Sequence, residues 1–238
     1  MAKSLINVQP ELKLDWATHK AAKYACQNWH YSKCMPSGKT VKIGVWEKDI
    51  FIGVVIFSMG SGNATRGDKY GLKPKTEVAE LARVALTKHT NTVSKIISIS
   101  IKMLKKQSAG LKMIISFADY ERIGHIGTIY QAGNWIYAGM SKSNDVIVIH
   151  GERVHRRSVF AKYGINSLVW VKQNIDPSAH FMSNTKHRYI MPLDNETRDR
   201  LKHLGKPYPK RVTKANSGDQ LESEGAIPIH TLQTHEAA

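Results

Sequence analysis

Apolar residues near the N-terminus recur at the spacings of an α-helix. Ala21, Tyr24, Ala25 and Trp29 would share one helical face. Asp15 precedes them, at a position where a carboxylate can cap the first turn. The sequence therefore predicts a helix that begins after Asp15 and ends at about Trp29.

Further along the chain, apolar residues occur at every second position instead of at helical spacings. Residues 41–45 alternate between Val or Ile and polar residues, which is typical of a half-buried strand. Residues 50–57 form a continuous apolar run rich in Val and Ile, which predicts a strand buried on both faces. Lys48-Asp49 separates the two segments and supplies a turn, so we expect a β-hairpin.

The later segments alternate between strand and helix after one long loop. The loop, residues 58–76, contains four glycines and four basic residues, and a loop of this length is usually functional. Strands are predicted at residues 77–86, 111–118, 135–140, 146–150 and 187–191, and helices at 93–106, 124–132 and 195–204, with another helix within 153–173.

This order of elements predicts an α/β fold with a mixed central sheet flanked by helices. The opening hairpin implies antiparallel pairing, whereas strands that alternate with helices imply parallel pairing across crossovers. We expect one catalytic domain at residues 1–211, which includes a basic C-terminal extension. Residues 212–238 have little apolar content, so we expect a disordered tail there.

The net charge of the chain indicates which class of molecule it binds. The 238 residues include 35 Lys and Arg against 19 Asp and Glu, which gives a net charge of +16. A field of this sign attracts polyanions, and nucleic acid is the polyanion that fits best. The longest apolar run is too short to span a bilayer, and the N-terminus lacks the apolar core of a signal peptide. We therefore expect a protein of the reduced cytosol that binds nucleic acid and no membrane, in an oligomeric state that the sequence leaves open.

The two cysteines provide no disulfide framework, but they raise the question of a metal. Cys26, His30 and Cys34 are spaced by four residues, so one continuous helix would place them on one face. The break in the helical pattern after Tyr31, followed by Pro36, ends such a helix too early. We therefore expect no metal site.

Two segments resemble the GNAT acyltransferase family. Residues 80–86, Glu-Leu-Ala-Arg-Val-Ala-Leu, look like the central strand that leads into the donor-binding helix of that family. Residues 129–135, Ile-Tyr-Gln-Ala-Gly-Asn-Trp, look like its Leu-Tyr-x-x-x-Gly-Phe segment. The resemblance implies a GNAT-like sheet, with Tyr130 as general acid and a backbone N–H near Val84 as an oxyanion donor.

The chain departs from this family where coenzyme A should bind. GNAT enzymes hold the diphosphate of coenzyme A with a glycine-rich loop before the donor-binding helix, whereas residues 89–95 here read His-Thr-Asn-Thr-Val-Ser-Lys. A helix N-terminus with such residues can still bind phosphate, but the β-branched Val93 obstructs close approach to the backbone. Candidate donor-binding residues are Arg83, Asn91, Thr92, Ser94 and Lys95.

A long polar segment resembles the Mom family of DNA modification proteins. The segment is residues 116–139, and residues 28–32, Asn-Trp-His-Tyr-Ser, and 155–158, His-Arg-Arg-Ser, also look like that family. The resemblance covers roughly residues 1–211. It implies an enzyme that acts in the cytoplasm of a phage-infected bacterium and converts adenine in double-stranded DNA to N6-carbamoylmethyladenine, which blocks restriction.

The candidate catalytic residues follow from this chemistry. Asp119 comes after a buried strand, where it could orient or deprotonate the adenine amino group, or simply cap a turn. His125 titrates near neutral pH, and Tyr31 offers a flat ring on which a flipped adenine could stack. The full catalytic set is Ser116, Asp119, His125, Tyr130, His30 and Tyr31. Candidate DNA contacts are Arg66, Lys69, Lys73, Arg156, Arg157, Lys186 and Arg188.

The implied product constrains the donor. Its carbamoylmethyl group joins adenine through CH₂, so acetyl transfer gives the wrong bond. Glycyl transfer followed by rearrangement gives the right atoms, which suggests an activated glycine such as glycyl-tRNA, with acetyl-CoA as the conventional alternative. An RNA or protein N-acyltransferase on the same fold, and a non-catalytic DNA-binding protein, are the competing functions.

Overall fold

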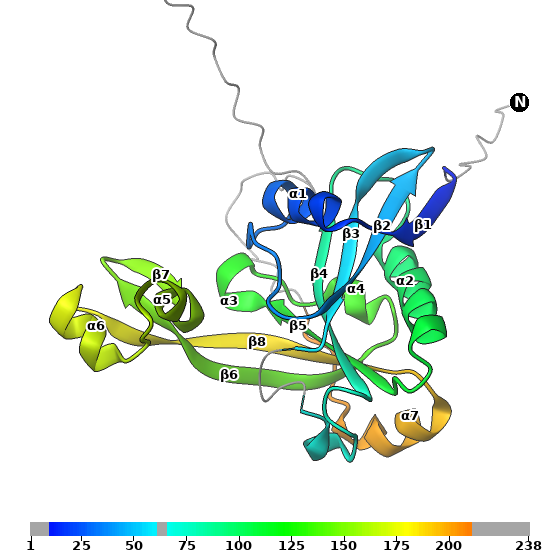
Figure 1. Ribbon diagram of the computed structural model, residues 1–238. Helices are drawn as coiled ribbons and strands as arrows, with labels where there is room; N and C mark the ends of the chain where they lie inside the picture. Colours follow the sequence, from blue (N-terminus) through cyan, green and yellow to red (C-terminus); the bar gives the residue numbers. More distant parts are fainter. Residues whose placement is uncertain (1–9, 61–65, 211–238) are drawn as a thin grey trace, which may run out of the picture.

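The computed structural model of the protein describes residues 10–60 and 66–210 (Figure 1). Within these ranges eight strands form one sheet in the order β1-β2-β3-β4-β5-β8-β6-β7. Helices lie on both of its faces, so the predicted mixed α/β fold is confirmed. The tail predicted at 212–238 lies outside the described residues, as does part of the predicted loop. No helix of the described ranges is long and apolar enough to cross a membrane.

The strands are β1 (Leu12–Trp16), β2 (Thr40–Glu47), β3 (Ile50–Ser58), β4 (Val78–Leu86), β5 (Met113–Asp119), β6 (Ile136–Ile149), β7 (Glu152–His155) and β8 (His180–Pro192). The helices are α1 (His19–Trp29), α2 (Val93–Gln107), α3 (Tyr120–Ile123), α4 (Thr128–Gln131), α5 (Arg156–Tyr163), α6 (Leu168–Asn174) and α7 (Asn195–Leu201), with 3₁₀ turns η2 (Gly67–Tyr70) and η3 (Lys202–Leu204). The predicted loop thus contains one 3₁₀ turn, and the helix expected within 153–173 is a strand and two helices.

The N-terminal part contains the predicted hairpin. β2 and β3 pair antiparallel, and Lys48 and Asp49 take φ angles of 49° and 62°, as a tight hairpin turn requires. The predicted cap is wrong, because Asp15 lies in β1 opposite Gly44. The helix is capped by Thr18 instead, whose hydroxyl accepts a hydrogen bond from the backbone N–H of Ala21 at 3.2 Å.

Strands β4 and β5 pair over a short stretch and then separate. Their parallel ladder covers only Val78–Glu80 against Met113–Ile115, with α2 as the crossover. An irregularity opposite Ile56 and Phe57 leaves Ala82 as an extra residue of β4, which bends this strand. The expected parallel pairing in the second half holds only here, because β8 returns antiparallel to both β5 and β6.

The two faces of the sheet are covered by different helices. Val55 and Phe57 of β3 belong to the main core, which also contains buried residues of α2 and α4. Val54 and Ile56 point to the opposite face and pack with α1. Strand alternation therefore places α1 on one side of the β4–β5 separation and α2 with α4 on the other.

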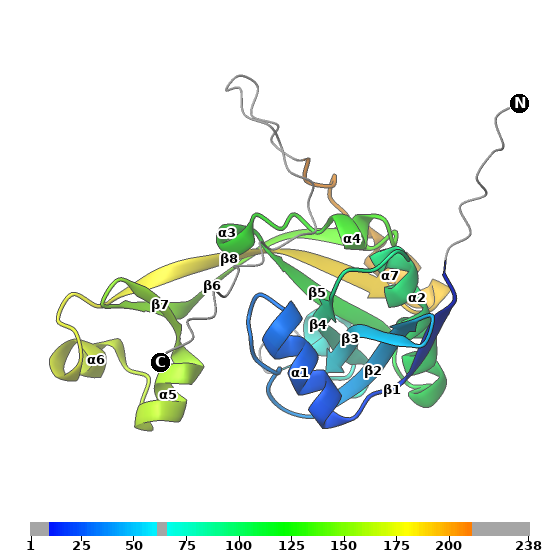
Figure 2. The same cartoon turned by 90° about the horizontal axis from the view of Figure 1, so that it is seen from above.

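Residues 141–186 form an arm that extends from this core (Figures 1 and 2). The two strands predicted at 135–140 and 146–150 are one long strand, β6, which pairs with β8 along the whole arm. The arm also contains β7, α5 and α6, and it has its own small core. The buried residues of that core are Ile147, Ile149, Val159, Val171 and Ala179.

Candidate active site

A cavity of about 270 Å³ lies where β4 and β5 separate. It brings together four predicted catalytic residues, His30, Tyr31, His125 and Tyr130, with the predicted donor residue Arg83. The complete lining is Trp29, His30, Tyr31, Leu81, Ala82, Arg83, Val84, Phe117, Ile123, His125, Ile129 and Tyr130. Residues from both faces of the sheet therefore meet in one cavity.

Tyr130 and Ser116 form a buried hydroxyl pair beside this cavity. Their oxygens are 2.8 Å apart, and Ser116 Oγ is also 2.8 Å from the carbonyl oxygen of Leu81. A serine has one hydroxyl proton, so when Ser116 donates to Leu81 it accepts the proton of Tyr130. Burial raises the pKa of Tyr130, which keeps the phenol protonated at neutral pH. The pair can therefore hold a proton for donation.

His125 is held in a defined tautomer above Tyr130. Its Nδ1 is 3.1 Å from the backbone nitrogen of Gly127 and accepts that hydrogen bond. The neutral ring therefore carries its proton on Nε2. Burial lowers the pKa of His125, so the neutral form dominates at neutral pH. The ring stacks on Tyr130 with centroids 6.0 Å apart. His125 therefore presents its Nε2–H as a hydrogen-bond donor next to the ring of Tyr130.

His30 and Tyr31 form a flat wall on the α1 side. The rings lie 4.3 Å apart at an interplanar angle of 31°. His30 is buried, and its Nδ1 accepts a hydrogen bond of 3.1 Å from the backbone N–H of Ser32. The position of the wall is therefore fixed by the turn that ends α1.

Asp119 is buried at the end of β5 but does not line the cavity. Its carboxylate lies 3.8 Å from Nζ of Lys186, its register partner on β8. Its carbonyl oxygen accepts a hydrogen bond of 3.3 Å from the backbone N–H of His125. The geometry therefore connects Asp119 to the cavity through the backbone of His125.

Glu80 is a site residue that the sequence reasoning missed. It occupies the last rung of the β4–β5 ladder, opposite Ile115. Burial raises the pKa of its carboxyl group, while the positive charges of Arg83, Lys186 and Arg157 act to lower it. A glutamate in a strand whose only other ionisable residue is Arg83 is a signal that could have identified it, because ionisable residues in buried strands are uncommon.

The predicted donor residues divide into three groups. Arg83 donates from Nε to the carbonyl oxygen of Cys34 at 3.2 Å, so it fastens the loop after α1. Thr92, Ser94 and Lys95 instead border a second cavity of about 530 Å³, which lies between α2 and the α4–β6 turn. Asn91 is buried, and its side-chain amide donates a hydrogen bond to the carboxylate of Glu47.

A carboxylate already occupies the loop before α2. Glu47 accepts hydrogen bonds from the backbone N–H groups of Thr90, at 3.0 Å, and Asn91, at 2.6 Å, and from the Asn91 amide at 2.8 Å. Burial favours a higher pKa for Glu47, but these hydrogen bonds outweigh it and lower the pKa. The backbone N–H groups of Thr90 and Asn91 are therefore engaged within the protein, whereas Thr92, Ser94 and Lys95 at the start of α2 border the second cavity.

The predicted DNA contacts also differ in their surroundings. Arg157 is exposed on α5, and the predicted contacts of the loop, Arg66, Lys69 and Lys73, are exposed as well. Arg156 instead donates to Asn166 and stacks over Phe181, and Arg188 donates to the carbonyl oxygen of Ala138 at 2.9 Å. Exposure therefore favours Arg157 and the loop residues as DNA contacts.

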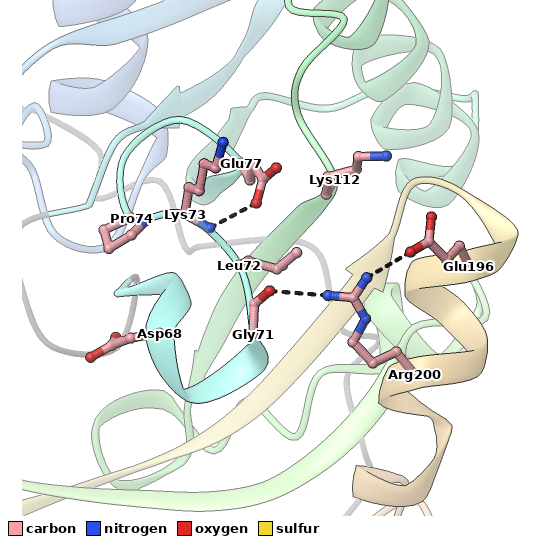
Figure 3. A pocket seen from close by; sticks show the side chains of 9 residues that line it. All are labelled: Asp68, Gly71, Leu72, Lys73, Pro74, Glu77, Lys112, Glu196 and Arg200. Carbon is pink, nitrogen blue, oxygen red and sulfur yellow. Dashed lines mark hydrogen bonds and ion pairs between the residues drawn. The ribbon is translucent and has the colours of Figure 1, made fainter.

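A further cavity of about 490 Å³ lies beside Lys73 and α7 (Figure 3). Arg200 bridges it, with hydrogen bonds to the carbonyl oxygen of Gly71 at 3.0 Å and to Glu196 at 2.9 Å. The Glu77 carboxylate accepts the backbone N–H of Lys73 at 2.7 Å. Because these charged groups pair with one another, a structural role is favoured here. No cluster of metal-ligating side chains occurs within the described ranges.

Comparison with known proteins places the chain in a family. It is 28% identical over 207 residues to the methylcarbamoylase Mom of Escherichia phage Mu, with 84% of each chain covered. Similar solved structures include a Bacillus subtilis acetyltransferase in complex with CoA (13% identity, TM-score 0.43, 77% of this chain and 100% of that chain). Another is the ribosomal-protein-S5-alanine acetyltransferase of Vibrio fischeri (11% identity, TM-score 0.43, 79% and 98%). The Mom protein family matches residues 11–210, so the protein belongs to the Mom protein family.

Proposed function

We propose that this protein is a transferase that converts adenine in double-stranded DNA to N6-carbamoylmethyladenine. Acting in the cytoplasm of the infected host, it would protect phage DNA from restriction. The observation that carries the proposal is the cavity between β4 and β5, which combines a flat aromatic wall with the buried Ser116–Tyr130 pair. Family membership and the net charge of +16 support a DNA substrate.

The adenine must leave the base stack to reach this cavity, because its reacting amino group lies inside the duplex. Tyr31 would stack on the extruded base from the α1 side. His125 would donate from Nε2 to a ring nitrogen or to the donor carbonyl. The backbone carbonyl of Asp119 would position His125, while its carboxylate pairs with Lys186.

The first reaction step is acyl transfer to a weak nucleophile. The amino nitrogen attacks the donor carbonyl carbon and releases a proton to water, the bond from that carbon to the leaving group breaks, and the leaving group gains a proton from Tyr130. The edge of β4 beyond Glu80 has no β5 partner, so its backbone N–H groups can face the developing oxyanion. The Ser116–Tyr130 pair then recovers a proton from solvent.

An activated glycine gives the proposed product with balanced atoms. Glycyl transfer forms N6-glycyl-adenine, and its free amine attacks ring carbon 6 to form a five-membered ring. Cleavage of the bond from carbon 6 to the original nitrogen leaves NH–CH₂–CO–NH₂ on the base. Acetyl transfer would give the wrong bond to the base, so an activated glycine such as glycyl-tRNA is the proposed donor, with acetyl-CoA as the conventional alternative.

Nucleoside mass spectrometry tests the proposal. DNA from cells that express the wild type should contain carbamoylmethyl-deoxyadenosine, and labelled glycine should place its nitrogen in the modified base. Tyr130→Phe should lower the yield by about 100-fold or more, because it removes the proton donor but keeps the ring. Tyr163→Phe, on the arm, is the matched control and should leave the yield unchanged.

The outcomes separate the competing functions. Unmodified adenine with the wild type would contradict the proposal and leave an RNA or protein acyltransferase, or a DNA-binding protein. Modified adenine without label from glycine would retain the enzyme and exclude only the glycyl donor. An unchanged yield with Tyr130→Phe would exclude the proton-donor role.

A further inference from the structure

Helix α5 of the arm exposes almost all of its surface. Val159 is its one buried residue, and Phe160 has 55% of its surface exposed. The helix also carries Arg156, Arg157 and Lys162. An exposed aromatic side chain among basic residues is typical of a surface that contacts nucleic acid.

One ion pair and one electrostatic interaction connect α5 and the strand before it to the active site. Arg153, in the strand before α5, lies 3.6 Å from Glu121 of α3. The charge of Arg157 acts on the carboxylate of Glu80, at the base of the β4–β5 separation. Figure 2 shows α5 and α1 on the same side of the sheet, and the wall formed by His30 and Tyr31 follows the end of α1.

Helical geometry places Phe160 beside Arg157. Arg157 and Phe160 are three residues apart and therefore neighbours on one face of α5. Tyr163 is engaged elsewhere, because its ring packs against Trp170 of α6 at 5.4 Å. Phe160 is therefore the exposed aromatic side chain that neighbours Arg157 on α5.

We propose that Phe160 is a wedge that enters the DNA duplex and fills the space left by the extruded adenine, while Arg157 contacts a neighbouring phosphate. This inference rests on the proposed function, since it requires that adenine enters the cavity. Extruding a base costs stacking and pairing free energy, and an inserted apolar side chain offsets part of that cost. The substrate is thus duplex DNA, and the arm is the element that opens it.

Fluorescence of 2-aminopurine tests the wedge without any donor. The probe replaces the target adenine in a duplex whose sequence the wild type modifies in cells. Wild-type protein should raise the fluorescence, and Phe160→Ala should reduce the fraction extruded by on the order of tenfold. A duplex with a mismatch at the target, where extrusion costs less, should respond equally to both proteins.

Controls distinguish a wedge from a loss of folding or affinity. Phe160→Trp keeps a large flat ring and should restore extrusion. Val169→Ala removes an exposed side chain of α6, also on the arm, and should behave as wild type. Binding by fluorescence anisotropy should change less than about threefold in all variants, because phosphate contacts dominate affinity.

Two results would overturn the inference. One is equal extrusion of the matched duplex by wild type and Phe160→Ala, and the other is no extrusion by the wild type. If the wild type nevertheless modifies adenine in cells, the proposed function stands and only the wedge fails. If adenine stays unmodified in cells, the proposed function fails by its own test.

Discussion

Gly127 meets two constraints that only glycine satisfies together. Its φ angle is +86°, and a Cβ atom built there would lie 2.2 Å from the ring of Tyr189. The same residue supplies the N–H that fixes the tautomer of His125. At the scale of one residue, a missing side chain thus supports both the packing and the chemistry of the cavity.

We predict that Gly127→Ala lowers the free energy of unfolding by about 2–4 kcal/mol, since it adds a steric overlap to an unfavourable φ angle. Gly124→Ala is the control, because Gly124 also has a positive φ, +66°, but a Cβ there would meet nothing within 4 Å. It should cost about 1 kcal/mol. Chemical denaturation measures both, and equal costs would show that the contact with Tyr189 contributes nothing.

At the scale of elements, Glu47 joins three segments that are distant in sequence. It ends β2, and it binds the loop that leads into α2 through Thr90 and Asn91. Asn91 extends the network to the carbonyl oxygen of Pro10 at 3.0 Å and to Nζ of Lys95 at 2.8 Å. The start of α2 is therefore fixed by a side chain of another strand.

Replacing Glu47 with Gln should lower the free energy of unfolding by about 1.5–3 kcal/mol at pH 7, because charge-assisted hydrogen bonds are lost. The folded pKa of Glu47 lies below the ordinary value of 4.5, so this contribution is present above that pH. It is lost as the pH falls through the lower, folded pKa. The difference between wild type and variant should therefore shrink in acid.

The measurement is denaturation at several pH values between about 2 and 7, the range over which carboxylates titrate. Glu11→Gln, at an exposed position, is the matched control and should change stability by less than about 0.5 kcal/mol. A difference between wild type and Glu47→Gln that stays constant with pH would contradict the assigned role of the carboxylate.

The elements that the sequence predicted correctly have strong local patterns. The hairpin and α2 follow from runs of apolar residues with clear spacing. Strand β1 was not predicted, because its alternation of apolar and polar residues covers only two leucines and because an aspartate before a helical pattern is typical of an N-cap. The outer half of β8 was missed because His180–Lys186 is largely polar, and only pairing with β6 makes it a strand.

The site shows the same division. His30, Tyr31, His125 and Tyr130 were predicted from motifs, and the fold brings them around one cavity. The partners of Arg83 and Glu47 are 49 and 44 residues away in sequence, so no local pattern indicates them. Long-range pairs of this kind decide whether a charged residue is available to a ligand or is used internally.

At the scale of the whole molecule, the arm adds a second surface to a compact catalytic core. It holds its own hydrophobic cluster and exposes the basic and aromatic residues of α5. Affinity for DNA should therefore depend on charges of α5 that lie outside the lining of the cavity. The salt dependence of the DNA affinity therefore reports on these charges independently of the catalytic activity.

We predict that Arg157→Ala reduces the slope of log Kd against log salt concentration by about 1, because one phosphate contact is lost. Anisotropy with a duplex from about 50 to 200 mM salt gives the slope. Lys172→Ala, an exposed substitution on α6, is the control and should leave the slope unchanged if α6 faces away from DNA. An unchanged slope with Arg157→Ala would remove α5 from the DNA interface.

The long strand β6 contains two irregularities against β8, one between Tyr137 and Met140 and one between Ser143 and Val146. Each inserts one residue without changing the pairing on either side, so each bends the ribbon. Deletion of a single residue at either place would remove one bulge and change the angle at which the arm, with α5, leaves the core. Insertions and deletions at these two places, more than substitutions, are therefore the changes by which evolution could adjust the reach of such an enzyme over its substrate.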